Sequence, residues 1–396
     1  MGSPEPDQAR LRSLVEELEP LERFSGSEGE RRAAELIAER LRGLGCSVEI
    51  EEERVHGTFT WPLGLLSAVG CLAALAGLRG RRIAAVLGGL VAAAAIADDI
   101  SGGRRPFRAL LPQRSTWNVV AEAGDRAAAR TVVVLAHHDA ARSGLVFHPA
   151  PQRAVEKRFP GLIERTDTGL PLWFPVVGGP LLGALGALTG RRGLMWAGAV
   201  MATLNTAFFA DIASRPVVPG ANDNLTGVAG LVALAQALSE RPVHGLRVLL
   251  VSCGSEESLQ EGVRAFGARH FARLPPERTW FVNLESVGSP KLALLEGEGP
   301  LVMRDYDANW REAFAQHAAG AGVPLRRGLR ARLTTDSSWP HRHGYRVATL
   351  ISITRWKSVA NYHWPSDVSA NVDYSTVAQA VTATEAAIRG LAAEER

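Results

Sequence analysis

Four long apolar runs, arranged as two pairs, constrain the fold of this chain more than any other feature. Residues 61–78 and 83–97 form the first pair, residues 170–188 and 193–210 form the second, and a short arginine-rich turn joins each pair. Each run is close to the roughly 20 residues that a helix needs to cross a bilayer core. The runs are apolar around the whole helix circumference, and their many Gly and Ala residues allow close helix packing. They predict two transmembrane hairpins with four spans.

Two other interpretations of these runs stay open. The runs would also suit a buried helical hairpin or lid in a soluble protein, or a peripheral pair that only half enters the bilayer. The paired arrangement with polar, arginine-rich turns favours membrane hairpins. We therefore expect a multi-pass protein of the cell membrane that contacts lipid through its hairpins.

The side of the membrane on which the remaining chain lies is less constrained. The positive-inside rule places the arginine-rich turns in the cytoplasm and the remaining chain outside it. Residues 1–6 contain no charged-then-apolar signal peptide, which weakens the export interpretation. Cations also flank the runs on the side opposite the turns: Arg104, Arg105, Arg108, Lys157 and Arg158. Taken together, these signals favour the extracytoplasmic side for the remaining chain.

Composition excludes several classes of protein. The 396 residues are 46% hydrophobic and 21% charged, which is ample for a core and excludes wholesale disorder. The net charge is only +3, and the arginines form no basic, aromatic-laced face, so nucleic acid is not an expected partner. Cys46, Cys71 and Cys253 lack the spacing of a zinc knuckle or redox pair. We expect Cys71 and Cys253 to be buried, inert thiols.

Outside the hairpins the chain alternates between predicted helices and predicted strands. A capping box of Ser27 and Glu30 predicts a helix that ends near residue 41. Strands are expected at 47–53, 117–121, 131–136, 247–252, 279–284 and 346–353, and further helices at 227–238, 260–271 and 374–391. Solid apolar strands between helices favour an α/β fold with a mostly parallel sheet covered by helices on both faces. Ligands bind such sheets beyond the carboxyl ends of the strands.

Five short stretches of acids and histidines lie at these strand ends or open the loops beside them. A soluble domain has no packing use for so many carboxylates beside apolar strands, because an unpaired buried charge is costly. In chain order they have the residue types of a two-metal hydrolase site. The stretches are His137-His138-Asp139, Asp223-Asn224, Glu256-Glu257, Glu285 and Tyr362-His363.

The first two stretches suit metal binding through a histidine and a carboxylate. In an extended segment His137 and Asp139 point the same way, so Asp139 can orient the ring of a metal-binding His137. His138 points to the opposite face, and we expect it to be a bystander. Asp223 is placed to present one oxygen to each of two metals. The alternative role for Asp223 is a helix N-cap.

The later stretches add acids and a phenol. Glu256 and Glu257 are adjacent, so one can bind a metal while the other holds its water; the alternative is the first turn of a helix, where acids are favoured. Glu285 ends another strand with a carboxylate. Beside the late His363, the phenol of Tyr362 could donate to a developing oxyanion.

Together these stretches resemble metallopeptidase family 28, the two-zinc exopeptidases that include bacterial aminopeptidases and glutamate carboxypeptidase. The resemblance implies a three-layer, zinc exopeptidase-like fold. It implies that His137, Asp223 and Glu285 hold one zinc and that Asp223, Glu257 and His363 hold the other. Asp223 would bridge the two ions, which in such sites lie roughly 3.5–4 Å apart.

The same resemblance assigns the catalytic roles. It implies Glu256 as general base, Asp139 as the residue that orients the histidine, and Tyr362 as a donor to the transition state. The peptidase domain would then comprise residues 8–60, 98–151 and 215–396, interrupted by hairpins at 61–97 and 170–210.

The chain departs from the family pattern in three places. The family more often has Asp where Glu285 stands. The segment between Asp139 and Asp223 is normally short and here carries the second hairpin. Residues 334–338 match a family loop near the substrate pocket, with Ser337 where a histidine is frequent.

We therefore expect a membrane-associated exopeptidase that hydrolyses peptide bonds with two zinc ions, and an aminopeptidase rather than a carboxypeptidase. A carboxypeptidase needs a cation for the substrate carboxylate, which Arg355 or Lys357 could supply, although a solvated turn is the alternative for both. Other readings are a one-zinc glutaminyl cyclase-like acyl transferase and a non-catalytic, peptidase-like binding protein. Because the second hairpin leaves from the metal-ligand loops, we also hypothesise that the hairpin bundle roofs the site or turns it toward the membrane.

Overall fold

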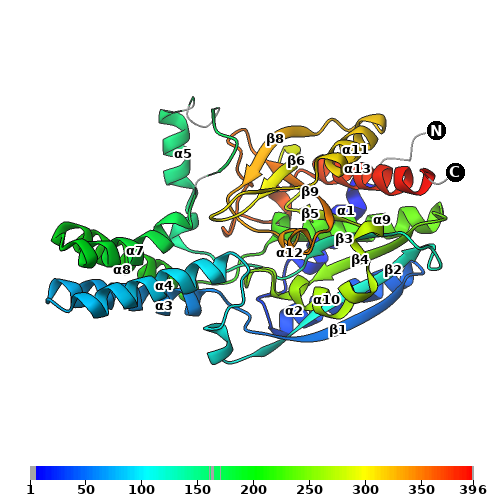
Figure 1. Ribbon diagram of the computed structural model, residues 1–396. Helices are drawn as coiled ribbons and strands as arrows, with labels where there is room; N and C mark the ends of the chain where they lie inside the picture. The colour runs from blue at the N-terminus through cyan, green and yellow to red at the C-terminus, as the bar shows by residue number, and fades with distance from the viewer. Residues whose placement is uncertain (1–5, 160, 162–164, 170, 395–396) are drawn as a thin grey trace.

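The computed structural model describes residues 6–159, 161, 165–169 and 171–394. Its centre is one nine-stranded sheet in the order β1-β2-β4-β3-β5-β9-β6-β7, with β8 pairing to β6 (Figure 1). The strands are β1 Ser47–Val55, β2 Arg114–Gly124, β3 Thr131–His137, β4 Arg247–Cys253, β5 Thr279–Glu285, β6 Lys291–Glu298, β7 Arg304–Asp305, β8 Arg326–Ala331 and β9 Arg346–Ile353.

The middle of the sheet is parallel, and its flanks are antiparallel except that β8 pairs in parallel with β6. Strand β3 pairs in parallel with β4 and β5, and β5 pairs in parallel with β9. Toward one edge β2 pairs antiparallel with β4 and β1, and toward the other β6 pairs antiparallel with β9. The predicted α/β fold is confirmed, while the whole sheet is mixed. Three of the parallel strands, β3, β4 and β5, end at or just before acid and histidine stretches, at His137, Cys253 and Glu285.

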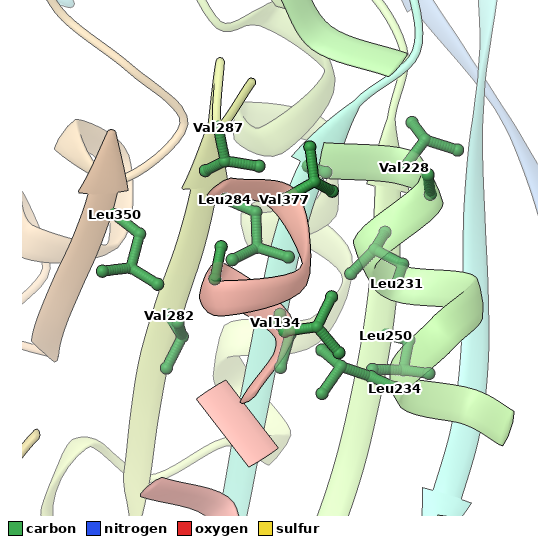
Figure 2. Packing of buried hydrophobic residues seen from close by; sticks show 14 of the residues in the cluster. Val134, Val228, Leu231, Leu234, Leu250, Val282, Leu284, Val287, Leu350 and Val377 are labelled. Atoms are coloured by element: carbon green, nitrogen blue, oxygen red, sulfur yellow. The ribbon is translucent and has the colours of Figure 1, made fainter. Parts of the chain in front are cut away.

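Helices cover both faces of this sheet because its strands are apolar on both sides. Within β3, Val132 and Val134 pack into one core cluster, whereas Val133 and Leu135 pack into another on the opposite face. The first face is covered by α1 Gln8–Leu18, α2 Glu28–Gly43, α9 Thr226–Glu240, α11 Ala308–Gly320 and α13 Tyr374–Ala393, and the second by α10 Glu261–His270 and α12 Ser338–Arg342. Figure 2 shows the first face, where strand side chains meet leucines of α9 and Val377 of α13.

The predicted helix after Ser27 begins as expected. The Ser27 hydroxyl accepts a hydrogen bond from the amide of Glu30 at 3.1 Å. The Glu30 carboxylate, however, accepts from the amide of Gly26 rather than from that of Ser27. The reciprocal half of the capping box is therefore displaced by one residue.

The apolar runs form a four-helix bundle that projects from one side of the sheet (Figure 1). Its helices are α3 Thr60–Leu78, α4 Arg82–Ile100, α7 Phe174–Thr189 and α8 Arg192–Ser214. Helices α3, α4 and α8 are long and apolar enough to cross a membrane. Helix α7 has 16 residues with Pro180 inside it, and Leu170, where the third span was expected to begin, lies outside the described residues. Three of the four expected spans therefore reach spanning length in the described part of the chain.

Small residues line the inside of the bundle and large apolar residues its outside. A Cβ on Gly198 of α8 would lie 2.4 Å from the backbone nitrogen of Gly183 in α7, so these helices touch backbone to backbone. Exposed apolar side chains include Trp61, Leu72, Ile83, Leu87, Val91, Leu188 and Trp196. Cys71 is only half-buried, with its Sγ 3.2 Å from Thr203 Oγ1, whereas Cys253 is buried as expected. An apolar outer surface of this kind marks an interaction with lipid or with another apolar partner.

Candidate active site

All five acid and histidine stretches meet at one edge of the sheet. Strands β3, β4 and β5 run parallel and end at His137, Cys253 and Glu285, so the residues at and just after these ends come together. The resulting pocket holds about 320 Å³ of empty space, its open mouth included. Its acidic side is formed by Asp223, Glu256, Glu257 and Glu285 with Tyr362 and His363, and its apolar wall by Leu333, Ile351 and Val359.

A first group joins a histidine to two carboxylates. His137 Nε2 lies 3.4 Å from Asp223 Oδ1 and 3.5 Å from Glu285 Oε1. The ligand atoms of these three buried residues all lie within 4.8 Å of one another. Glu285, which stands where the family more often has Asp, therefore reaches the same histidine as Asp223 does.

A second group shares Asp223 with the first. His363 Nε2 lies 3.3 Å from Asp223 Oδ2 and 3.2 Å from Glu257 Oε2. The two oxygens of Asp223 thus face two different histidines. This is the arrangement that a carboxylate bridging two cations requires.

The atoms of both groups fit divalent metal ions. His137 Nε2, Asp223 Oδ2 and Glu257 Oε1 are buried without a hydrogen-bond partner among the described residues, although buried polar atoms ordinarily have one. Burial raises the pKa of Glu256 well above its usual range, and the carboxylates of Glu285 and Glu257 add to the rise. Cations would offset this crowding of negative charge. Imidazole and carboxylate ligands of this kind are those of catalytic zinc sites.

Asp139 contacts both His137 and the turn that carries Glu256 and Glu257. Its Oδ1 lies 3.4 Å from His137 Nδ1, as expected for a carboxylate that orients the ring. It also accepts hydrogen bonds from the amides of Glu256 and Glu257, each at 3.0 Å, and from the hydroxyl of Ser25 at 2.6 Å. One buried carboxylate therefore fixes the histidine and the turn that carries both glutamates.

Glu256 and Glu257 lie in a loop and not in the first turn of a helix, because α10 begins only at Glu261. The loop is sharply bent, with positive φ values at Ser255 and Gln260. The Gln260 side-chain amide donates to Glu256 Oε1 at 3.1 Å. The loop conformation turns the two adjacent acids into the pocket.

Asp223 is not a helix cap. It lies in a short turn, Ala221–Leu225, with non-helical φ and ψ, and α9 begins after it at Thr226. The backbone amide of Asp223 donates to Asp367 Oδ2 at 3.1 Å. The side chain of Asp223 is thereby left to face the two histidines.

His138 and the two later cations lie away from these groups. His138 Nδ1 is 2.9 Å from Ser252 Oγ, and burial lowers the pKa of His138 to about 4. Arg355 lies over the ring of Trp356, and Lys357 Nζ donates to the carbonyl of Thr166. Neither cation lines the acidic pocket.

Two supporting residues were not predicted from the sequence. Arg23 is fully buried and donates to the carbonyls of His138 at 2.8 Å and Pro219 at 2.7 Å, so it ties together the loops that carry His137 and Asp223. Glu30 is fully buried and accepts from the amide of Ser255 at 2.8 Å. Their partners lie 115 or more residues away in the chain, and local sequence patterns carry no signal for such contacts.

An aromatic residue outside the four bundle helices connects the bundle to the site. The ring of Phe147 packs edge-on against His363, with 4.6 Å between the centroids, and against Tyr362 at 5.8 Å. The same ring packs on a cluster that contains Leu63 of α3 and Ile212 of α8. The root of the bundle is therefore continuous with the wall of the site.

Comparisons with known proteins agree with this geometry. The model of peptidase family M28 matches residues 206–388. No curated protein matches the sequence. Solved structures of the same fold include a zinc aminopeptidase from Bacillus subtilis, with 15% identity and a TM-score of 0.58 over 100% of this chain and 97% of that one.

Two further solved structures resemble this chain. An aminopeptidase from an Aneurinibacillus species has 13% identity and a TM-score of 0.54 over 97% of this chain and 93% of its own. A glutaminyl cyclase from Bacteroides thetaiotaomicron has 13% identity and a TM-score of 0.58 over 98% and 99%. Together these findings support a hydrolase. The resemblance to peptidase family M28 is thus confirmed, by the family's model over residues 206–388 and by the fold over nearly the whole chain.

Proposed function

We propose that this protein is a membrane-associated exopeptidase that hydrolyses peptide bonds with two co-catalytic zinc ions, and that it acts as an aminopeptidase. The observation that carries the proposal is the position of Asp223, whose two oxygens face His137 and His363 at 3.4 and 3.3 Å. A carboxylate placed in this way serves two cations at once.

The two groups divide the ligands between the ions. His137, Asp223 and Glu285 would hold one zinc, and Asp223, Glu257 and His363 would hold the other. When bound, zinc polarises a carbonyl group and lowers the pKa of water to roughly 7. Three ligand carboxylates and Glu256 carry four negative charges when ionised, which two divalent cations balance.

Glu256 is the proposed general base. Gln260 holds its Oε1, and the carboxylate faces the pocket that the ligands line. From this position Glu256 takes a proton from the attacking water and returns it to the leaving amine. Tyr362 lines the same pocket, and burial raises the pKa of its phenol well above the usual range, so the phenol stays protonated and can donate to the oxyanion.

The pocket favours the free amino end of a peptide. Its described lining contains no Lys or Arg that could bind a substrate carboxylate, which favours a substrate whose bound end is an amine. The apolar wall of Leu333, Ile351 and Val359 suits an apolar side chain next to that amine.

A glutaminyl cyclase-like acyl transferase is the second candidate, because solved cyclases share the fold. Two complete groups of ligands favour the two-zinc peptidase over the one-zinc cyclase. The same completeness argues against a non-catalytic binding protein.

The bundle supports attachment to the cell membrane. Its outer surface is apolar over three helices of spanning length. Arg105 and Arg108, which flank the runs on the catalytic side, are buried beside Asp99 and therefore do not act as free membrane-proximal charges. Arg104, Lys157 and Arg158 stay exposed on that side, but the five exposed arginines of the two turns outnumber them, which supports a catalytic domain on the extracytoplasmic side.

Zinc content and substrate choice test the proposal together. Purified protein should hold two zinc ions per chain and should cleave peptides with a free amino terminus while sparing the N-blocked forms. One zinc with cyclisation of N-terminal glutamine would favour the cyclase. Preferential cleavage of N-blocked peptides would indicate a carboxypeptidase.

A further inference from the structure

A second pocket lies between the metal groups and the root of the bundle. It shares Glu257 and His363 with the acidic pocket. Phe59 and Thr60, at the start of α3, and Ile212, in the last turn of α8, line its side toward the bundle. Among the described lining residues Arg142 is the only Lys or Arg.

Arg142 is held in place without an acidic partner. Its Nη1 donates to the carbonyl of Arg215 at 2.6 Å, and its guanidinium lies 4.5 Å from the centroid of the Phe24 ring. The nearby Asp211 is engaged by the side chain of Arg215 at 2.8 Å. Within the described chain no carboxylate lies at ion-pair distance from Arg142, so its charge is free to meet an anion.

The backbone around Arg142 is fixed as well. Ser143 donates to the carbonyl of Pro216 at 3.1 Å, and Val218 donates to the carbonyl of Ala141 at 2.9 Å. These bonds join the segment after Asp139 to the segment before Asp223. An arginine on such a frame, stacked on an aromatic ring, is pre-organised to bind a carboxylate through its planar fork.

The two pockets meet at Glu257 and His363 and differ in charge. A peptide whose scissile bond lies at these residues extends one end into each pocket. The acidic pocket suits the amino end, as proposed above, so the leaving portion enters the pocket of Arg142.

We propose that Arg142 binds a free carboxylate on the leaving portion of the substrate. Since the pockets share two lining residues, that portion is short, about one or two residues of up to ~3.5 Å each. Phe24, Phe59 and Ile212 offer apolar surface to its side chain. The preferred substrates are therefore short peptides, dipeptides above all, with a free amine, a free carboxylate and apolar side chains. This inference rests on the proposed peptidase function.

The test compares an apolar dipeptide with its C-terminal amide, using the zinc-loaded full chain in detergent. Wild-type protein should cleave the acid with a kcat/KM about 10- to 100-fold above that of the amide, mainly through KM, as expected for a hydrogen bond to a charged group. Arg142→Ala should remove this advantage and leave cleavage of the amide unchanged. Arg142→Lys should keep part of it. Arg153→Ala, at an exposed position outside both pockets, is the matched control.

Three results would contradict the inference in distinguishable ways. Equal cleavage of acid and amide by the wild type would overturn the role of Arg142 while leaving the peptidase proposal intact. This comparison uses the wild type alone and does not depend on the folding of a variant. An equal loss on both substrates in Arg142→Ala would show that the arginine is structural. Cleavage of neither peptide by zinc-loaded wild type would contradict the proposed function itself.

Discussion

The carboxylate of Asp139 joins parts of the site that lie more than 100 residues apart in the chain. It lies beside His137 and accepts hydrogen bonds from the backbone amides of Glu256 and Glu257. Its loss would therefore displace a metal ligand and the proposed base together. The sequence predicted only the contact with His137, since spacing within a strand reveals side-chain direction but not a partner on another strand.

Replacing Glu256 with Gln tests its role as the base. The variant keeps the size of the side chain and removes the proton acceptor, so kcat should fall by at least about 100-fold. Zinc content should stay unchanged, because Glu256 is not among the proposed ligands. Glu257→Gln is the comparison and should lose zinc. Turnover and metal analysis measure both, and full activity of Glu256→Gln would refute the assignment.

Glu298 should make stability depend on pH. Burial raises its pKa to about 8, against hydrogen bonds from Thr335 and Tyr306 that favour the ionised form. The folded protein therefore holds Glu298 as a neutral carboxyl. The contribution of this neutral form to folding stability is complete below the unfolded pKa near 4.5 and is lost as the pH rises through 8. Glu298→Gln should therefore gain stability relative to wild type between about pH 5 and pH 8.

Unfolding of the zinc-loaded protein at several pH values measures this effect. Glu39→Gln is the control, since the Glu39 side chain is exposed. A constant difference between Glu298→Gln and wild type across the range would show that Glu298 titrates normally.

At the scale of elements, the end of α4 is fastened to the catalytic loop. Asp99 in α4 forms an ion pair with Arg108 at 2.7 Å, and Arg108 donates to the carbonyl of Ser258 at 2.8 Å. Arg108 also lies 3.4 Å from Glu261, the first residue of α10. The first hairpin is thus linked through one buried arginine to the loop that carries Glu256 and Glu257.

Breaking this link should destabilise the protein strongly. Arg108→Met leaves the buried Asp99 with only the more distant Arg105, at 3.9 Å, and should cost about 3–5 kcal/mol of unfolding free energy. Replacing both Asp99 and Arg108 with apolar residues should cost less, because the carboxylate is then removed together with its closest partner. Arg104→Met, at an exposed position, is the control. Chemical unfolding in detergent measures the series, and equal losses in Arg108→Met and Arg104→Met would exclude the link.

The long, regular elements were predictable and the short ones were not. Strands such as β4 and β9 are continuous apolar runs, and their predicted bounds differ from the observed ones by at most one residue. Strand β7 has two residues, too few for any periodic signal. Helix α1 was not predicted, although its buried residues Leu11, Leu14, Val15 and Leu18 follow helical spacing. The mixed character of the sheet depends on pairings between distant segments, which local patterns do not encode.

At the scale of the whole molecule, the bundle should determine where the protein resides. Wild type should sediment with membranes and need detergent for release. Four outward positions of the bundle are 60–78% exposed: Leu72, Ile83, Leu87 and Val91. Replacing all four with Gln should weaken membrane insertion and leave the packing inside the bundle intact. Gln at Leu110 and Val302, which are equally exposed away from the bundle helices, is the control. Wild type that stays soluble without detergent would contradict membrane attachment.

The second hairpin should also restrict the size of substrates. Phe147 and Ile212 connect it to the wall of the site. Deleting residues 152–214 and inserting a short linker should open this side and raise cleavage of long peptides relative to short ones. Kinetics on a peptide length series measure the change. An unchanged length preference would argue against a roof over the site.

The bonds that close the root of the second hairpin have a practical consequence. Residues 141–143 and 216–218 already pair with each other, so the chain between them leaves and re-enters the catalytic frame at a single point. Apart from Phe147, which packs against His363, the segment between these residues does not set the spacing of His137 and Asp223. The position is therefore a natural grafting point, at which a different anchor or a soluble linker can replace the native segment without redesign of the metal-binding loops.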